Sequence, residues 1–269
     1  MAQAENPMKG MQICDEIIFP LPLPKDEFLR LEEKSLTAEE YSEAIRKFLP
    51  EINIVPDVKN IRIPIIHGIT LYSYLGFLNV FPSVLAIDIY VNRKKVVSGL
   101  SYGTFTQYQY IFPGCYRIQV CEAGKKAPAL LDTFVHLIGY RVYTAAITGI
   151  EIDAALVLVN DSILPVPEEN SFLRFVQLSS SAPVMDAYLE DRLILTEIDY
   201  RESSRYLSVL SGNHDLKIKD YISNCIIIED SNLKLEGGNA YTVYIIGDIN
   251  DKTGMQMLID KDESNGINF

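Results

Sequence analysis

The chain has 269 residues, of which 48% are hydrophobic and 22% are charged. This length and composition are typical of a globular protein with two or three well-buried domains, and they exclude a wholly disordered chain. The net charge of −12, from 36 acidic and 24 basic residues, argues against binding nucleic acid or an anionic membrane surface by charge neutralisation.

The N-terminal region, residues 1–70, combines a proline-rich arm with helical signals. Prolines at alternate positions over 20–24 predict an extended arm, and a weak amphipathic pattern predicts a short helix over 26–36. Thr37 and Glu40 form a capping box that predicts a second helix, which a proline ends. We expect the apolar stripe of this helix to pack on the next domain or on a partner protein.

No apolar segment of the length of a signal peptide or a transmembrane helix occurs in the chain. The sequence as given therefore predicts synthesis in the cytoplasm without an export signal, and it predicts no membrane insertion.

The stretch 73–149 occurs again, without a gap, 98 residues later as 171–247. Roughly one aligned position in five is identical, which indicates a duplicated unit. The identities fall mainly on glycine, tyrosine and aspartate. We place the first repeat at 71–164, the second repeat at 171–260, and an acidic tail at 261–269.

Within each repeat, apolar and polar residues alternate as in strands that have one buried face. Leu85, Ile87, Ile89 and Val91 share one face of a strand, while Ala86, Asp88 and Tyr90 share the other. Short strands of this kind, separated by glycine and proline turns every 8 to 12 residues, are typical of a β-sandwich. The predicted fold is mainly β: two tandem Ig-like β-sandwich domains with a short helical N-terminal region.

Four aspartate and tyrosine positions recur in both repeats and are the candidate site residues. A carboxylate beside phenol groups is able to bind a sugar or a cation. The same aspartates are also able to hold a corner of the fold, by accepting hydrogen bonds from a neighbouring strand or from a tyrosine hydroxyl. We favour the structural role and keep binding as the alternative. The positions are Asp88, Tyr90, Tyr102 and Tyr108 in the first repeat, and Asp186, Tyr188, Tyr200 and Tyr206 in the second.

Motifs for catalysis, cofactors and metals are missing from the sequence. His67, His136 and His214 are the only histidines, and none is near a nucleophile elbow. The acidic segment that begins at Asp260 has its glycine out of place for an EF-hand loop. We therefore expect a protein that is not an enzyme and that has no cofactor and no bound metal.

The four cysteines do not have the spacing of a zinc site or a redox motif; they are Cys14, Cys115, Cys121 and Cys225. Cys115 and Cys121 share one predicted strand, which separates them by about 20 Å and excludes a disulfide between them. We expect reduced structural thiols, with cross-links between molecules as the alternative. The one basic cluster, Arg93-Lys94-Lys95, is expected at a solvated hairpin tip and has no counterpart in the second repeat.

Several short motifs in this order resemble the bacterial repeat called domain of unknown function 4397. The first repeat carries them as Asp88-Ile89-Tyr90, Tyr102-Gly103-Thr104, Pro113-Gly114 and Tyr143-Thr144. The second repeat keeps most of them but lacks the Gly-Thr that follows the tyrosine. The resemblance implies an Ig-like sandwich without established chemistry, in a family usual in secreted or cell-envelope proteins. Deposition on a spore or cell surface from the cytoplasm reconciles that setting with the missing export signal.

The expected function is that of a non-enzymatic structural or interaction protein, with a protein partner or self-association. The alternative is a carbohydrate- or polymer-binding module in which Tyr102, Tyr108 and Tyr110 stack on sugar rings. Nucleic acid is not an expected partner.

Overall fold

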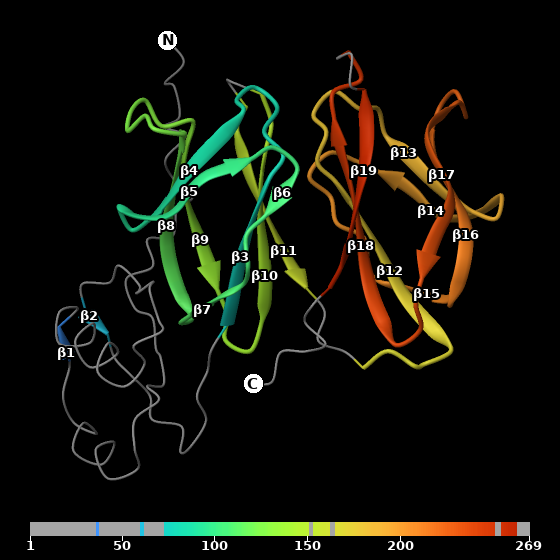
Figure 1. Ribbon diagram of the computed structural model, residues 1–269, viewed down its shortest axis with the longest axis horizontal. Helices are drawn as coiled ribbons and strands as arrows, with labels where there is room; N and C mark the ends of the chain where they lie inside the picture. The colour runs from blue at the N-terminus through green and yellow to red at the C-terminus, as the bar shows by residue number, and fades with distance from the viewer. Residues whose placement is uncertain are drawn as a thin grey trace, which may run out of the picture.

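The computed structural model describes residues 73–150, 153–161, 165–250 and 254–262, and two short pairs, 36–37 and 60–61. The described part of the chain is built from strands and contains no helix. The prediction of a mainly β protein is therefore confirmed. Figure 1 shows two β units side by side, the first coloured cyan to green and the second yellow to red.

The first repeat consists of two sheets. One has the strand order β5-β4-β8-β9; the other has the order β11-β10-β3-β6, with β7 also paired to β3. We call them the outer and the inner sheet, because the second one faces the other repeat (Figure 1). The strands of the first repeat are β3 (Ser73–Asn79), β4 (Ala86–Val91), β5 (Lys94–Ser101), β6 (Thr104–Phe105), β7 (Gln109–Ile111), β8 (Gly114–Glu122), β9 (Leu131–Leu137), β10 (Val142–Thr148) and β11 (Ala155–Asp161).

The second repeat has the same strand order. Its outer sheet is β14-β13-β16-β17 and its inner sheet is β15-β12-β18-β19. In each repeat the first strand pairs in parallel with the strand before the last, β3 with β10 and β12 with β18. The strands are β12 (Asn170–Gln177), β13 (Met185–Leu189), β14 (Arg192–Ile198), β15 (Leu207–Leu210), β16 (Gly212–Asp220), β17 (Ile226–Leu235), β18 (Asn239–Gly247) and β19 (Met255–Lys261).

The Ig-like connectivity predicted from the sequence is not confirmed by this strand order. A constant-type Ig domain places its first, second, fifth and fourth strands in one sheet and the other three in the second sheet. Here the hairpin β4–β5 lies within one sheet, and the first strand lies in the opposite sheet. Alternation of apolar residues predicts that a strand has one buried face, but it does not specify which strand pairs with which.

The two sheets of each repeat pack face to face around an apolar core. Ile87, Ile89 and Val91 of β4 are buried, as predicted, and so are the matching Met185 and Ala187 of β13. Leu85, which continues the same alternation, is 93% exposed, because β4 begins only at the next residue. The apolar period therefore predicts the core face correctly within the strand and fails just outside it.

The two central strands of the inner sheet of the first repeat are buried on both faces. Every residue of β10 is buried, and so is every residue of β3. One face of these strands covers the core of the first repeat, while the other face packs against the second repeat. The residues between the repeats form one apolar cluster, which we call the inter-repeat apolar cluster: Leu78, Val80, Ala146, Val159, Val176, Leu178, Tyr244 and Ile246.

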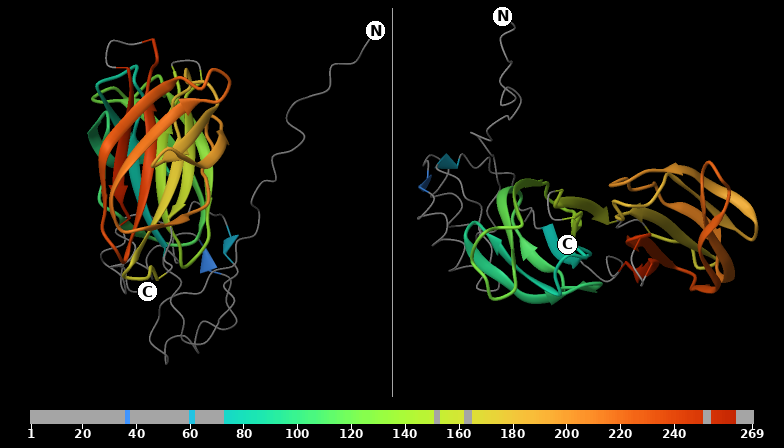
Figure 2. Two further views of the ribbon diagram at one scale, coloured as in Figure 1. Left: turned by 90° about the vertical axis from the view of Figure 1, so that its right-hand side faces the viewer. Right: turned by 90° about the horizontal axis from the view of Figure 1, so that it is seen from above.

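Polar contacts add to this inter-repeat packing. The Thr148 hydroxyl donates to the carbonyl of Leu178, and the Arg201 guanidinium lies 2.7 Å from the Asp153 carboxylate. Seen from above, the inner strands of the two repeats lie next to each other (Figure 2). The repeats therefore meet through a packed interface, in addition to the linker that joins them.

The predicted helices of the N-terminal region lie outside the described residues, except at Leu36–Thr37. These two residues form β1, which pairs with β2 (Asn60–Ile61), so the helical prediction is not supported there. In the described part of the chain, no helix has the length and apolar character needed to cross a membrane.

The acidic tail begins later than the sequence predicts. Lys261 is the last residue of β19, and Asp262 is only 3% exposed. Burial of a charged residue at this point indicates specific partners, which lie at the inter-repeat interface.

Candidate functional site

The aspartates of the repeated Asp/Tyr motif brace a hairpin in each outer sheet. Asp88 is 1% exposed and accepts hydrogen bonds from Lys95 Nζ at 2.5 Å, Gly99 N at 2.9 Å and Gly124 N at 3.1 Å. Burial acts to raise the pKa of Asp88, but the hydrogen bonds and charge of Lys95 and the two backbone donors hold the pKa below its usual value. The carboxylate thus fixes the β4–β5 hairpin and the loop after β8.

Asp186 occupies the same place in the second repeat with fewer partners. It accepts a hydrogen bond from Thr196 Oγ1 at 2.8 Å and one from Glu197 N at 3.0 Å. The backbone donor sits at a positive φ in both repeats, 66° at Gly99 and 58° at Glu197. Both aspartates therefore anchor the same irregular part of the neighbouring strand, β5 or β14. None of the hydrogen bonds described above comes from a tyrosine hydroxyl.

The tyrosines next to these aspartates lie on the outward face with lysines over their rings. Lys95 Nζ is 5.5 Å from the centre of the Tyr90 ring, and Lys219 Nζ is 4.2 Å from that of Tyr188. A cation over an aromatic face is favourable. These tyrosines are thus engaged within their own sheet.

Tyr102 and Tyr200 lie where the repeats meet. Tyr102 packs on the inter-repeat apolar cluster. The Arg201 guanidinium lies 4.7 Å from the centre of the Tyr200 ring and bridges to Asp153 of the first repeat. Both tyrosines contribute to the interface, and no pattern in the sequence predicts that position.

Tyr108 belongs to a buried trio in the first repeat. Its hydroxyl lies 2.9 Å from Thr144 Oγ1 and donates to Asp161 Oδ2 at 3.0 Å, to which Thr144 Oγ1 also donates at 2.9 Å. Burial raises the pKa of Tyr108, and the Asp161 charge raises it further. The phenol therefore stays protonated and acts as a donor.

The second repeat contains the same trio, at Tyr206, Thr242 and Asp262. The Tyr206 hydroxyl donates to Asp262 Oδ2, and Thr242 Oγ1 donates to Asp262 Oδ1 at 3.0 Å. Burial raises the pKa of Tyr206, whereas the nearby Arg174 charge opposes that rise. The two trios come from equivalent strands, and each ends at the aspartate that follows or closes the last strand.

Arg174 of β12 joins the two trios. Its Nη2 donates to Asp161 Oδ1 at 2.6 Å and to Thr242 Oγ1 at 2.7 Å, and its Nη1 donates to the carbonyl of Asn160 at 2.8 Å. The side chain is 2% exposed, and its guanidinium lies 4.5 Å from the centre of the Tyr206 ring. We call this set the inter-repeat polar cluster: Tyr108, Thr144, Asp161, Arg174, Tyr206, Thr242 and Asp262.

One cation in this cluster faces two carboxylates. Arg174 Nη2 is 2.6 Å from Asp161 and 3.9 Å from Asp262. Burial raises the pKa of Asp161, and the guanidinium opposes the rise. Because a buried charge without a partner is strongly unfavourable, each carboxylate depends on Arg174 and on its hydroxyl donors.

The position of Arg174 is occupied by Gly76 in the first repeat. A Cβ atom at Gly76 would lie 3.0 Å from Cδ1 of the Tyr108 ring, so a larger side chain there would displace that ring. The second repeat therefore contributes the guanidinium of Arg174, and the glycine of the first repeat leaves room for the Tyr108 ring.

The aspartates of the polar cluster were missed in the sequence because the fixed 98-residue offset breaks before them. Thr148 pairs with Ala155, whereas the matching Ile246 pairs with Gln256, so the span across the last hairpin grows from seven to ten residues. Realigning the last strand by this difference brings Asp161 opposite Asp262. An aspartate at the end of the last strand of both repeats is the sequence feature that identifies them once the strands are realigned.

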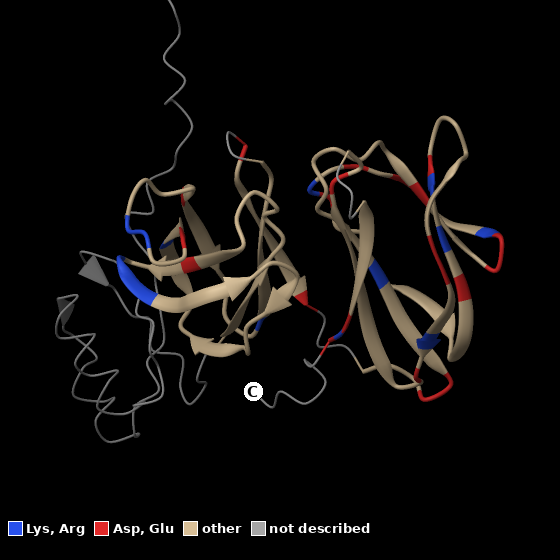
Figure 3. Cartoon of the chain, turned by 45° about the horizontal axis from the view of Figure 1, so that its top comes forward, with Lys and Arg blue, Asp and Glu red and all other residues tan. Residues whose placement is uncertain are grey.

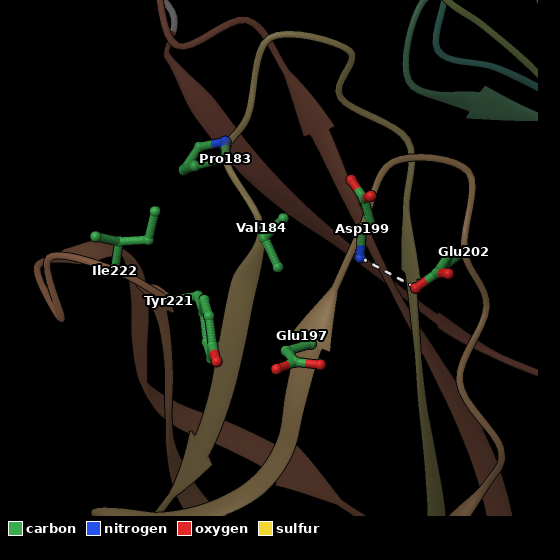
Figure 4. Close-up of a pocket in the computed structure, with 7 residues that line it drawn as sticks. All are labelled: Pro183, Val184, Glu197, Asp199, Glu202, Tyr221 and Ile222. Carbon is green, nitrogen blue, oxygen red and sulfur yellow. Dashed lines mark hydrogen bonds between the residues drawn. The ribbon is translucent and has the colours of Figure 1, made fainter.

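A hollow of about 460 Å³ lies at one end of the second repeat (Figure 4). Figure 4 shows an apolar side and, opposite it, an acidic side. The interaction of Tyr221 with the Glu197 carboxylate raises the pKa of Tyr221. The apolar side has Pro183, Val184, Tyr221 and Ile222, and the acidic side has Glu197, Asp199 and Glu202.

The first repeat has a hollow at the matching place, with a volume of about 690 Å³. Three of its residues correspond to residues of the other hollow at the 98-residue offset: Leu85 to Pro183, Ala86 to Val184, and Ala123 to Tyr221. We call the two the end hollows. Each carries one apolar side chain that is almost fully exposed, Leu85 at 93% and Ile222 at 91%.

The histidines have structural contacts or lie outside the described residues. His214 Nε2 lies 2.9 Å from the carbonyl of Leu210, and in the first repeat the hydroxyl of the matching Tyr116 donates to Phe112 at 2.8 Å. His136 lies beside Cys115, and His67 is not described. Within the described ranges, no three His, Cys, Asp or Glu side chains gather as metal ligands.

Comparison with protein families identifies the chain. The family model described as domain of unknown function (DUF4397) matches residues 73–188 and 171–267. The chain belongs to the DUF4397 family. The two matches correspond to the two repeats, so the resemblance noted from the short motifs is confirmed.

A search of solved structures matches this DUF4397 protein to chains that include three with low TM-scores. A candidate cell adhesion protein from Bacteroides uniformis has a TM-score of 0.24 and 9% identity, over 72% of this chain and 97% of its own. The CBM26 module of Eubacterium rectale Amy13K, crystallised with maltoheptaose, has a TM-score of 0.23 and 9% identity, over 72% and 99%. A candidate adhesin from Bacteroides ovatus has a TM-score of 0.19 and 8% identity, over 71% and 94%.

These TM-scores are too low to support an inference about fold or function. A comparison with curated proteins finds no match.

Proposed function

We propose that this DUF4397 protein is a non-enzymatic structural or interaction protein, in which two repeats act as one rigid body and present their exposed surfaces to a protein partner. The observation that carries the proposal is the inter-repeat interface, with its polar cluster around Arg174 and its apolar cluster around Tyr244. Domains joined only by a linker move relative to one another, whereas a large apolar interface fixes their orientation.

The buried ion pair adds orientational specificity to this interface. Arg174 satisfies Asp161 only when β12 of one repeat lies against β11 of the other. Sliding or rotating the repeats would leave two buried charges without partners, a penalty of several kcal/mol. The interface therefore resists reorientation more strongly than its apolar contacts alone would.

A rigid pair of repeats holds the two end hollows at a constant separation. Each hollow exposes a large apolar side chain, and exposed apolar surface beside polar groups is a common mark of a protein contact. Two weak contacts at a fixed spacing strengthen each other when a partner reaches both. We assign the end hollows as the contact points, and we propose a setting at the cell envelope or the spore surface.

Rotational diffusion measured by ¹⁵N relaxation tests the rigid-body part of the proposal. Both repeats should show one common correlation time, and the Asp161→Ala variant should show two shorter ones if it remains folded. A wild-type protein with two independent correlation times would refute it.

Binding at the end hollows is tested with Leu85→Asp and Ile222→Asp. Because both side chains are exposed, neither change should alter the melting temperature, while self-association in sedimentation velocity, or binding of a protein partner, should weaken in each. A matched control is Leu210→Asp, a substitution of another exposed leucine, 71% accessible, outside the hollows. Equal effects of all three changes would contradict the assignment.

The carbohydrate-binding alternative is separated by a glycan array. The three tyrosines named for it do not form a platform: Tyr108 is in the buried trio, Tyr102 packs at the interface, and Tyr110 is 39% exposed and lies against Tyr74, with ring centres 4.6 Å apart. Sugar binding that Tyr110→Ala or Tyr221→Ala abolishes would replace the proposed function with this alternative.

A further inference from the structure

One corner of the first repeat that differs from the second contains a cysteine beside a histidine. Cys115 on β8 and His136 on β9 are direct partners in the sheet register, and Cys115 Sγ lies 3.4 Å from His136 Nδ1. Cys115 is half-buried and His136 is exposed. A thiol within hydrogen-bond reach of an imidazole is the arrangement in which a base activates a sulfur nucleophile.

A basic hairpin tip is joined to the same strand as Cys115. The β4–β5 hairpin tip, which carries Arg93 and Lys94, is hydrogen-bonded to Arg117, two residues from Cys115: Asn92 N donates to Arg117 O, and Arg117 N donates to Asn92 Oδ1, both at 2.9 Å. Figure 3 shows blue on this hairpin. On β9 the nearest acidic side chain, Asp132, forms an ion pair with Arg117 at 2.5 Å. Cationic surroundings favour the thiolate form of a cysteine.

The second repeat shows that the fold does not require this pair. The matching register pair is Asn213 and Lys234, and the residue that matches Arg117 is Asp215. The basic tip is also replaced there, since Asp191 corresponds to Arg93. Because the same sheet forms with neither thiol nor imidazole, packing does not explain their presence in the first repeat.

Exposed apolar side chains flank the histidine, one on β9 and one just after β9 ends. Phe134 and Ile138, two residues to either side of His136, are each 60% exposed. They give a partner molecule a surface to contact next to the thiol.

From these observations we propose that Cys115 and His136 form a reactive thiol site for thiol–disulfide exchange with a low-molecular-weight disulfide that carries carboxylates. His136 Nδ1 takes the thiol proton. The thiolate attacks one sulfur of the disulfide, the S–S bond breaks, and a mixed disulfide forms on Cys115. The released thiolate takes the proton from His136 and leaves as a thiol. Cys115 is oxidised and the released half is reduced, so no further oxidant is needed. The site is independent of the proposed function.

The same molecule contains the control for this reaction, because Cys225 is an exposed thiol on the second repeat. The full chain is mixed with oxidised glutathione at pH 7, and site-resolved mass spectrometry follows each cysteine. Cys115 should react more than about tenfold faster than Cys225, as expected of a thiol activated by a neighbouring base and cations. Equal rates at the two cysteines, or a slower Cys115, would overturn the proposal.

Two variants separate the contributions. His136→Asn should slow Cys115 about tenfold and move its rate–pH profile toward the ordinary thiol pKa of about 8.5, while the Cys225 rate and the melting temperature stay unchanged. Arg93→Ser with Lys94→Ser should slow the reaction with oxidised glutathione but not with an uncharged dipyridyl disulfide. An unchanged Cys115 rate in His136→Asn would show that the histidine is a bystander and would refute the site.

Discussion

The two repeats share the residues that make the fold and differ at two positions of the interface that joins them. Both have an aspartate under the outer hairpin and a Tyr–Thr–Asp trio at the edge of the inner sheet. At the interface, however, matched positions differ in size. Gly76 of the first repeat corresponds to Arg174 of the second, and Ala146 corresponds to Tyr244. Two large residues would collide and two small ones would leave a cavity, so divergence after duplication favours one specific pairing of repeat with repeat.

The largest effect should come from removing the aspartate that Arg174 binds. Asp161→Ala leaves a buried guanidinium without its nearest partner, and we expect the free energy of unfolding to fall by about 3–5 kcal/mol. Denaturant unfolding measures it. The control is Asp153→Ala, which breaks the exposed inter-repeat ion pair and should change stability by less than about 1 kcal/mol. Similar effects of the two changes would mean that the polar cluster does not hold the repeats together.

The next largest loss of stability should come from truncating Tyr244, the larger residue of the Ala146/Tyr244 pair. Tyr244 is fully buried and its ring lies 5.6 Å from that of Phe105 across the interface. Tyr244→Ala should destabilise the protein by about 3 kcal/mol through the cavity it leaves. It should also divide the thermal unfolding trace, measured by calorimetry, into two transitions. A single transition with unchanged midpoint would contradict the complementary interface.

A smaller effect should distinguish the two hairpin aspartates. Asp88→Asn removes a charge that holds Lys95, so we expect a loss of about 1.5–3 kcal/mol. Asp186→Asn should lose less, because Asp186 has no lysine partner among its described hydrogen bonds. Chemical denaturation of the two single variants measures the difference.

The pH dependence of the Asp88 contribution has a definite sign. The pKa of Asp88 in the folded protein lies below its usual value of 3.8. The stabilisation is therefore present above that value and is lost as the pH falls through the folded-state pKa. Melting temperatures of wild type and Asp88→Asn should converge in that acidic range. A gap that stays constant down to pH 2 would show that the charge of Asp88 is not what stabilises the hairpin.

The smallest effect should come from exchanging the residues at the positive-φ turn. Glu197 adopts a φ of 58°, a conformation that glycine accepts without strain and that Gly99 supplies in the first repeat. Glu197→Gly should stabilise the second repeat by about 0.5–1 kcal/mol, and Gly99→Glu should destabilise the first by about 1 kcal/mol. Opposite shifts in melting temperature are expected; shifts of the same sign would refute the backbone explanation.

How far the sequence predicts the candidate site depends on how local each signal is. The recurrence of Tyr108 as Tyr206 marked both trios, because a repeated tyrosine is visible at a fixed offset. Asp161 and Asp262 were not matched, since the longer hairpin shifts the second one out of alignment. The role of Arg174 is not predictable from the sequence, because one arginine on an apolar strand gives no indication of its distant partner.

By itself, the sequence determined the duplication, the β class and the buried faces of the central strands, because these depend on local alternation and on a repeat visible along the chain. Only the tertiary structure decided that the inner sheets face each other, that Arg174 of one repeat neutralises Asp161 of the other, and that Cys115 meets His136. Those contacts join residues far apart in the chain, and their energies depend on burial. Which strands pair, and which charged groups become buried partners, is decided when the sheets assemble, and the spacing of residues along the chain does not determine either.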